Sequence, residues 1–309
     1  MYCIIRCRFA YIGIWYTSVI IFTIKEGNMA TKKSASSTKK KTGVAAGAAK
    51  TRVTTVKAVE SKKVRPVSAL LNRNTNLLRT PIAGAAVAEF IGAFLLAVTV
   101  LIVRNEPFYL FIGLIGIFMM IGGLSGAHIN PAITIGAWVS RRIGWVRAVS
   151  YMAAQFLGAM LALVVMNAFI DQAPEITAEA ASFGQAAPQL FSAAALADGK
   201  EWPVFFAEVI GLIVLGFAYA SVLRTRVTEK ASGAITVGGA AFLAMALAST
   251  AATYVGASAA LNPAIAVTIE AVDFSNVWTL AAYFVAPVLG AVIGFFLYDL
   301  LRSAEVADR

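Results

Sequence analysis

The sequence is poor in the residues that build disulfide frameworks, metal centres and catalytic triads. Its two cysteines, Cys3 and Cys7, both lie in the first ten residues, so disulfides do not organise the fold. One histidine, His128, and 16 dispersed carboxylates argue against a His-rich metal enzyme or a His-based triad. Only 14% of the 309 residues are charged, against about 25% in soluble domains. We therefore expect neither an enzyme nor a metal site.

Apolar residues are abundant instead, at 59% of the chain with a mean hydropathy of +0.77. Six apolar stretches approach the roughly 20 residues that cross a bilayer as a helix, at 81–103, 107–124, 147–170, 203–223, 233–254 and 277–300. Two more, 130–139 and 262–269, are too short to cross. Because lipid tolerates irregular backbone only where protein or water surrounds it, these should point into a cavity. The pattern predicts an all-α membrane protein with six transmembrane helices and two re-entrant half-helices.

The net charge of +10 is concentrated before these spans. Residues 29–79 carry thirteen Lys and Arg against one Glu and lack apolar periodicity, which predicts a disordered basic cytoplasmic tail over residues 29–80. Anionic lipid headgroups attract such a tail by about 1 kcal/mol per basic residue, and without interleaved aromatics no nucleic-acid partner is expected. Residues 1–28 form an apolar extension, either a membrane anchor or the product of a start codon upstream of Met29.

Charge in the loops predicts the orientation. With the basic tail in the cytoplasm, six spans place most loop arginines and lysines on the cytoplasmic side, namely Arg141, Arg142, Arg147, Arg224, Arg226, Lys230, Arg302 and Arg309. Only Arg104 and Lys200 fall outside. This asymmetry follows the positive-inside rule, so we expect a multi-pass protein of the plasma membrane with both termini in the cytoplasm.

The apolar body contains an internal repeat over about 81–170 and 203–301, within a channel domain that we expect at 81–301. Ala-Glu-Phe-Ile-Gly begins at Ala88 and Ala-Glu-Val-Ile-Gly at Ala207, and Asn-Pro-Ala-Ile occurs twice, 132 residues apart. Each copy holds three spans, an odd number, so the second copy must be inverted relative to the first. Inverted repeats form a site near the bilayer midplane, where the halves meet.

Each Asn-Pro-Ala opens a short helix. Asparagine is a favoured N-cap and proline suits the first helical position. Inversion aims the two helix N-termini at each other, each with roughly half a positive charge, which opposes cations and protons but not neutral molecules. With their side-chain oxygens used as caps, the two asparagines should offer NH₂ groups to the lumen. We expect the two motifs to line a pore: Asn130, Pro131 and Ala132, and Asn262, Pro263 and Ala264.

These features resemble the aquaporin / major intrinsic protein family. The resemblance rests on Ser-Gly-Ala-His-Ile-Asn-Pro-Ala at 125–132, the second Asn-Pro-Ala, both Ala-Glu starts, and Gln-Phe-Leu-Gly-Ala at 155–159. It covers about residues 81–301. It implies a homotetramer with one pore per subunit and no cofactor. The implied function is a passive channel for water or small uncharged solutes such as glycerol, which excludes ions and protons.

The second motif departs from the family pattern. Ile265 stands where the family usually has an arginine, and Ala266 where glycerol channels often have an aspartate. By family spacing, the other residues of the outer selectivity filter fall at Leu110 or Phe111, Thr250 and Ala259. Such a filter has no fixed positive charge, so we predict a broader or more apolar constriction than in strict water channels.

Four polar residues inside the spans remain to be assigned. The resemblance implies that Glu89 and Glu208 accept hydrogen bonds from the backbone of the half-helix loops. We expect His128 to pack within the first of these loops, and Gln155 to form a helix–helix hydrogen bond. An intramembrane carboxylate is also a functional candidate by default, so the alternative is a proton-coupled secondary transporter that uses one of the two glutamates.

Overall fold

The computed structural model describes residues 2–11, 14–23, 81–224 and 230–307, so the predicted basic tail at 29–80 lies outside the described residues. The N-terminal residues form a hairpin of β1 (Tyr2–Tyr11) and β2 (Ile14–Thr23). The strands are antiparallel, with Tyr2 opposite Thr23 and Tyr11 opposite Ile14. Their many β-branched and aromatic residues favour this conformation over a short span. The hairpin and the helical body are separate compact units.

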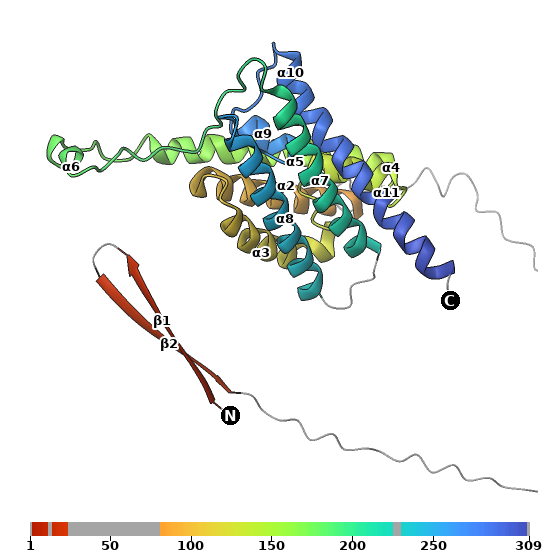
Figure 1. Ribbon diagram of the computed structural model, residues 1–309, viewed down its shortest axis with the longest axis horizontal. Helices are drawn as coiled ribbons and strands as arrows, with labels where there is room; N and C mark the ends of the chain where they lie inside the picture. Colours follow the sequence, from red (N-terminus) through yellow and green to blue (C-terminus); the bar gives the residue numbers. More distant parts are fainter. Residues whose placement is uncertain (1, 12–13, 24–80, 225–229, 308–309) are drawn as a thin grey trace, which may run out of the picture. The chain divides into compact units, whose positions relative to one another are not determined.

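The helical body is built from long helices, and a long connection that carries α6 extends between α5 and α7 (Figure 1). In the described residues, six helices are long and apolar enough to cross a membrane. They are α2 (Pro81–Val103), α3 (Pro107–Ser125), α5 (Trp145–Ile170), α7 (Glu201–Arg224), α8 (Lys230–Thr253), and a last helix made of α10 (Val277–Leu280), the π-helical turn η2 (Ala281–Val285) and α11 (Ala286–Ala307). The predicted all-α membrane fold is therefore confirmed for this body, and the predicted spans agree closely with the helices.

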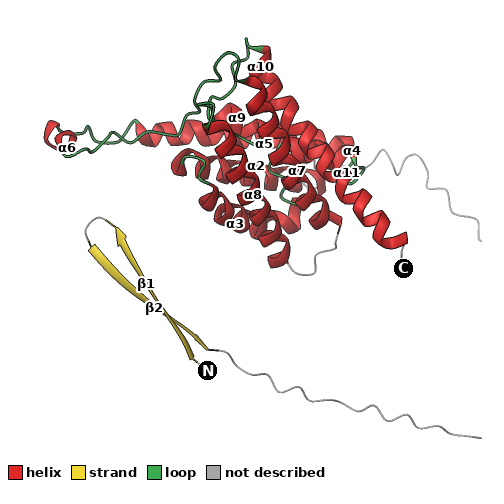
Figure 2. Ribbon diagram, in the orientation of Figure 1, coloured by secondary structure: helices red, strands yellow, loops and turns green. Residues whose placement is uncertain are grey.

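Three shorter helices complete the body (Figure 2). The half-helices α4 (Pro131–Val139) and α9 (Pro263–Thr268) begin directly after the two asparagines, as their capping chemistry predicts. A third, α6 (Ala178–Ser182), lies in the connection between α5 and α7 and was not predicted. Neither half-helix is long enough to cross a bilayer.

Helix packing repeats between the two halves of the body. The most extensive contacts join α2 to α5 in the first half and α7 to α11 in the second, while α3 packs on α8 between the halves. The half-helices are exchanged, since α4 packs on α11 and α9 packs on α5. This exchange brings the two Asn-Pro-Ala segments together in the middle of the body.

Two glycines allow the paired helices to approach closely. A Cβ atom at Gly158 of α5 would overlap the carbonyl oxygen of Phe90 on α2. At Gly290 of α11 it would overlap the carbonyl oxygen of Val209 on α7. Because the obstacle in each case is backbone and not a flexible side chain, a larger residue cannot be accommodated by a rotamer change. Small residues at such positions are typical of membrane helix interfaces.

Candidate functional site

The two asparagines cap the half-helices in the same way. Asn130 and Asn262 both have extended backbones, with φ of −152° and −158°. The Oδ1 atom of Asn130 accepts a hydrogen bond from the Ala132 N–H at 2.9 Å, and that of Asn262 accepts one from the Ala264 N–H at 3.0 Å. Both side chains are almost fully buried, at 4% and 5% exposed. The local sequence therefore fixes the orientation of each carboxamide, with its NH₂ directed away from its own helix.

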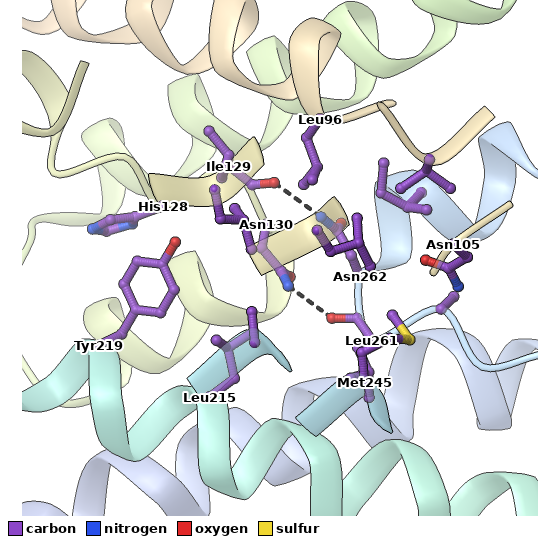
Figure 3. Close-up of a pocket in the computed structure, with 16 residues that line it drawn as sticks. Leu96, Asn105, His128, Ile129, Asn130, Leu215, Tyr219, Met245, Leu261 and Asn262 are labelled. Carbon is purple, nitrogen blue, oxygen red and sulfur yellow. Dashed lines mark hydrogen bonds between the residues drawn. The ribbon is translucent and has the colours of Figure 1, made fainter. Parts of the chain in front are cut away.

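Each carboxamide then reaches across to the other half. Asn130 Nδ2 donates to the Leu261 carbonyl at 2.8 Å, and Asn262 Nδ2 donates to the Ile129 carbonyl at 2.9 Å (Figure 3). These reciprocal bonds link the two N-termini, and sequence reasoning missed them because it assigned both NH₂ groups wholly to the lumen. A carboxamide NH₂ has two donors, so one N–H of each asparagine remains available.

The loops before the half-helices are held by the two buried glutamates. Glu89 of α2 accepts from the backbone N–H groups of His128 and Ile129 at 2.9 and 2.6 Å. Glu208 of α7 accepts from those of Ala260 and Leu261 at 2.6 and 2.8 Å. Both carboxyl groups are fully buried. The geometry is the one that the family resemblance implies for a supporting role.

The loop residues that precede the asparagines are conformationally strained. Ile129 and Leu261 have φ of 41° and 53°, in the left-handed region that costs an L-residue roughly 1–2 kcal/mol. Glycines make room for both side chains, because a Cβ at Gly92 would overlap Ile129 and one at Gly211 would overlap Leu261. The strained turns direct the two carbonyls toward the opposite asparagines, so the glutamate bonds and the glycines together maintain the cross-loop pairing.

A narrow cavity of about 50 Å³ runs past the paired asparagines. A site needs roughly 10–15 Å³ to hold one water, so the cavity has room for about three to five. Its polar side chains are Asn105, His128, Asn130, Tyr219 and Asn262, and its wall is otherwise mainly aliphatic, including Leu96, Val100, Leu114, Leu215 and Met245. His128 and Tyr219 lie to one side of the two asparagines and Asn105 to the other (Figure 3). The half-helix N-termini therefore face a small, mostly apolar lumen.

The structure brings only part of the predicted filter to this lumen. Leu110 and Ile265 line the cavity, and Ala259 lines a vestibule of about 210 Å³ next to it. Phe111 does not line either space and packs instead against Phe242, with ring centroids 6.4 Å apart.

Thr250 is the clearest departure from the predicted filter. Its side chain is on the exposed face of α8, where the hydroxyl donates to the Ala246 carbonyl at 2.7 Å. Four residues of α8 line the two spaces, each four positions after the last on one helix face: Ala241, Met245, Ser249 and Thr253. Thr250 lies about 100° around the helix from Ser249, so the placement by family spacing alone was wrong for this residue.

A hydrogen-bonded cluster surrounds His128 and Gln155. Gln155 Nε2 donates to Glu89 Oε2 at 2.8 Å and to Thr134 Oγ1 at 3.0 Å, which joins α5, α2 and α4. His128 is 1% exposed, its Nδ1 lies 3.3 Å from Thr134 Oγ1, and its ring meets Tyr219 edge to face. His128 thus both packs in the loop, as predicted, and lines the cavity, which was not predicted.

Among the cavity residues that sequence reasoning missed are Asn105, Tyr219 and Met245. For Met245 a signal was present, since Ala241, Met245 and Ser249 follow one another at helical spacing. For Asn105 and Tyr219 no local pattern was available, because their positions depend on how distant helices pack.

The family model for the Major intrinsic protein family matches residues 77–298. The chain belongs to this family. Members are channels and not enzymes. The match includes both half-helices and all six long helices up to the C-terminal part of α11.

Individual relatives agree with this membership. The chain is 28% identical to Aquaporin-1 of Bos taurus over 195 residues, which cover 61% of this chain and 65% of that protein. It is 28% identical to Aquaporin AqpM of Methanothermobacter marburgensis over 252 residues, 70% of this chain and 96% of that one. The aligned part thus spans about two thirds of the bovine protein's length and nearly all of the archaeal one.

A solved structure supports the fold. The body resembles the aquaglyceroporin from Plasmodium falciparum with a TM-score of 0.53, covering 74% of this chain and 100% of that one. The sequences are 19% identical, so this likeness concerns the fold alone.

Proposed function

We propose that this protein is a passive transmembrane channel for water and small uncharged solutes, and that it excludes ions and protons. The observation that carries the proposal is the meeting of two asparagine-capped helix N-termini at a narrow cavity. The six membrane-capable helices and the family membership support the same function. Solutes move down their gradients, with no energy source required.

Exclusion of cations follows from the charge at the centre of the cavity. The N-termini of α4 and α9 each contribute a partial positive charge of up to about half an elementary charge. The mainly aliphatic wall offers few groups to replace the hydration shell of an ion, whose transfer from water is strongly unfavourable. A neutral molecule that loses only part of its hydration meets a much smaller barrier.

Proton exclusion is proposed from the remaining N–H groups of Asn130 and Asn262. Both side chains line the cavity and both act only as donors toward it, since their oxygens serve as caps. A water between them turns its oxygen toward these donors and cannot accept a further hydrogen bond there. The donor-to-acceptor chain along which protons would move is thereby interrupted.

The proton-coupled alternative receives no support from the position of the glutamates. Glu89 and Glu208 are not among the residues that line the cavity, and each uses both oxygens to accept backbone hydrogen bonds. A proton carrier needs access to water from each side in turn, which this arrangement does not provide.

We further propose that the protein forms a homotetramer in the plasma membrane with both termini in the cytoplasm. The resemblance to the family supports the tetramer, and the loop charges support the orientation. Many large apolar side chains on the outside of the helices are exposed, including Ile112, Met120, Leu157 and Val164, as contact with lipid or neighbouring subunits requires. In this orientation the basic tail lies near anionic headgroups.

The test is a stopped-flow assay of proteoliposomes that contain the full chain. We expect osmotic shrinkage and glycerol uptake faster than in protein-free vesicles, and no acceleration of the collapse of a proton gradient across the vesicles. If neither water nor glycerol crosses faster when insertion of the protein has been verified, the proposed function is refuted. Solute uptake that depends on an imposed pH gradient would favour the transporter instead.

A further inference from the structure

Asn105 lies where the narrow cavity meets the vestibule. The cavity beside the asparagine pair and the vestibule on the side of the α5–α7 connection each have their own lining, and Asn105 belongs to both. It is located in the short turn between α2 and α3, far in sequence from either Asn-Pro-Ala motif. Because both linings include Asn105, we expect a molecule that moves between the two spaces to pass this residue.

We propose that Asn105 is the specificity-determining residue of this constriction, and that its Oδ1 atom selects solutes that can donate a hydrogen bond. The proposal rests on the proposed channel function and names the chemistry of its filter. The solute class is small, uncharged molecules with an O–H or N–H group, in preference to molecules of similar size that only accept hydrogen bonds.

The orientation of the carboxamide is determined by its partner. Asn105 Nδ2 donates to the Ala259 carbonyl at 2.7 Å. A carbonyl oxygen can only accept, so the NH₂ group must face Ala259 and the oxygen must face the other way. Asn105 is 6% exposed, and its Oδ1 atom has no hydrogen-bond partner among the described residues. Buried polar atoms are nearly always paired, so an unpaired buried acceptor on the residue that the two linings share indicates a position that a passing donor fills.

The backbone holds Asn105 in place before any solute arrives. Its φ is 60°, in the left-handed region that asparagine tolerates better than most residues. Its N–H donates to the Val100 carbonyl at 3.3 Å. The end of α2 is in turn tied to the α5–α7 connection, because the Phe191 N–H donates to the Leu101 carbonyl at 2.9 Å. The acceptor is thus positioned by the fold and not by the solute.

On the cavity side of Asn105 the neighbouring side chains cannot take over this role, whereas the vestibule side also carries the hydroxyls of Ser249, Thr253 and Ser258. Leu110, Met245 and Ile265 line the adjoining part of the cavity and carry no strong hydrogen-bonding group. Ile265 occupies the position where the family usually has an arginine, a side chain that only donates. On its cavity side the constriction therefore offers an acceptor on an apolar background, and a solute without a donor leaves Oδ1 unpaired, which disfavours its passage.

The experiment compares acetamide with dimethyl sulfoxide in proteoliposomes. The two solutes have the same number of heavy atoms, but only acetamide donates hydrogen bonds. We expect the protein-dependent permeability of the wild type to favour acetamide by about tenfold or more. In Asn105→Gly this ratio should fall while water still crosses, because glycine adopts the left-handed backbone without strain and removes the Oδ1 acceptor. The variant also frees the Ala259 carbonyl from its Nδ2 partner, and this remaining acceptor should keep the ratio somewhat above one.

Two further variants make the test specific. Thr250→Val removes a hydroxyl that points away from both spaces, so it should keep the wild-type ratio. Asn105→Leu replaces the carboxamide by an apolar group of similar size and should lower the flux of water and acetamide together.

A ratio in Asn105→Gly equal to that of the wild type, or a wild type that does not distinguish the two solutes, overturns the assignment of Asn105 and leaves the channel function standing. A wild type that passes neither water nor glycerol overturns the channel function and this assignment with it.

Discussion

Replacing Glu208 by glutamine tests whether the buried glutamates support the loops or carry protons. The wild-type carboxyl group accepts two backbone hydrogen bonds, from Ala260 at 2.6 Å and from Leu261 at 2.8 Å. Glutamine has the same shape but only one acceptor oxygen, so its NH₂ group must face one of the two N–H donors. One hydrogen bond is lost and two donors are buried against each other.

The magnitude follows from these two effects. A lost hydrogen bond and an unsatisfied buried donor together cost about 2–5 kcal/mol. In a domain of this size, each kcal/mol shifts the melting midpoint by about 2–4 °C, so Glu208→Gln should melt roughly 10 °C below the wild type. The assay is thermal unfolding of the purified protein in detergent, combined with water flux in proteoliposomes at low temperature. Glu201→Gln, in the first turn of the same helix and only partly buried, is the matched control and should change stability by no more than about 0.5 kcal/mol.

One result would refute this reasoning. If Glu208→Gln melts with the wild type but abolishes transport, or removes a response to an imposed pH gradient, the carboxyl group moves protons and does not merely hold the loop. If Glu208→Gln loses both stability and water flux, and neither it nor the wild type responds to a pH gradient, the result agrees with the supporting role.

Three other perturbations test separate parts of the structure. Asn262→Ala removes a helix cap and leaves the buried Ile129 carbonyl without its partner. We therefore expect the free energy of unfolding to fall by about 2 kcal/mol and the water flux to decrease. Unchanged values of both would contradict the cross-loop pairing. Gly158→Ala places a methyl group against the backbone of α2 and should destabilise the fold by about 1–3 kcal/mol. Gly116→Ala should not destabilise it, because a Cβ atom at Gly116 has no neighbour within 4 Å. Equal melting temperatures for the two variants would argue against the close approach of α5 to α2. Outside the membrane-spanning segments, hydrogen bonds from the side chain and backbone of Ser275 lower the pKa of Asp273. The stabilisation from these bonds is therefore present above the ordinary carboxyl pKa and is lost as the pH falls through the lowered value. Ser275→Ala should move this loss to higher pH, which hydrogen exchange of residues 270–276 between about pH 2 and 5 can detect.

Much of the fold could be predicted because its determinants are local. A run of about 20 apolar residues can satisfy its backbone in lipid only as a helix, so the six spans follow from the sequence with errors of a few residues at their ends. The starts of α4 and α9 were equally predictable, since an asparagine cap followed by proline acts within three residues. The inversion followed from the odd number of spans in each copy of the repeat. The tendency of residues 2–23 to pair as strands was missed, because their hydropathy alone did not distinguish a strand from a short span.

The lining of the constriction depended on the tertiary structure. The sequence by itself determined that two helix N-termini would meet, because the capping residues and the duplicated motif can both be recognised from neighbouring residues in the sequence. It did not determine that Met245 and Ser249 would reach the two spaces in place of Thr250, since a difference of one position turns a side chain by about 100° around a helix. Nor did it indicate Asn105, whose partner Ala259 lies 154 residues away. Contacts between distant segments arise only when helices pack at particular depths and rotations, and those are decided by the fit of all the side chains together.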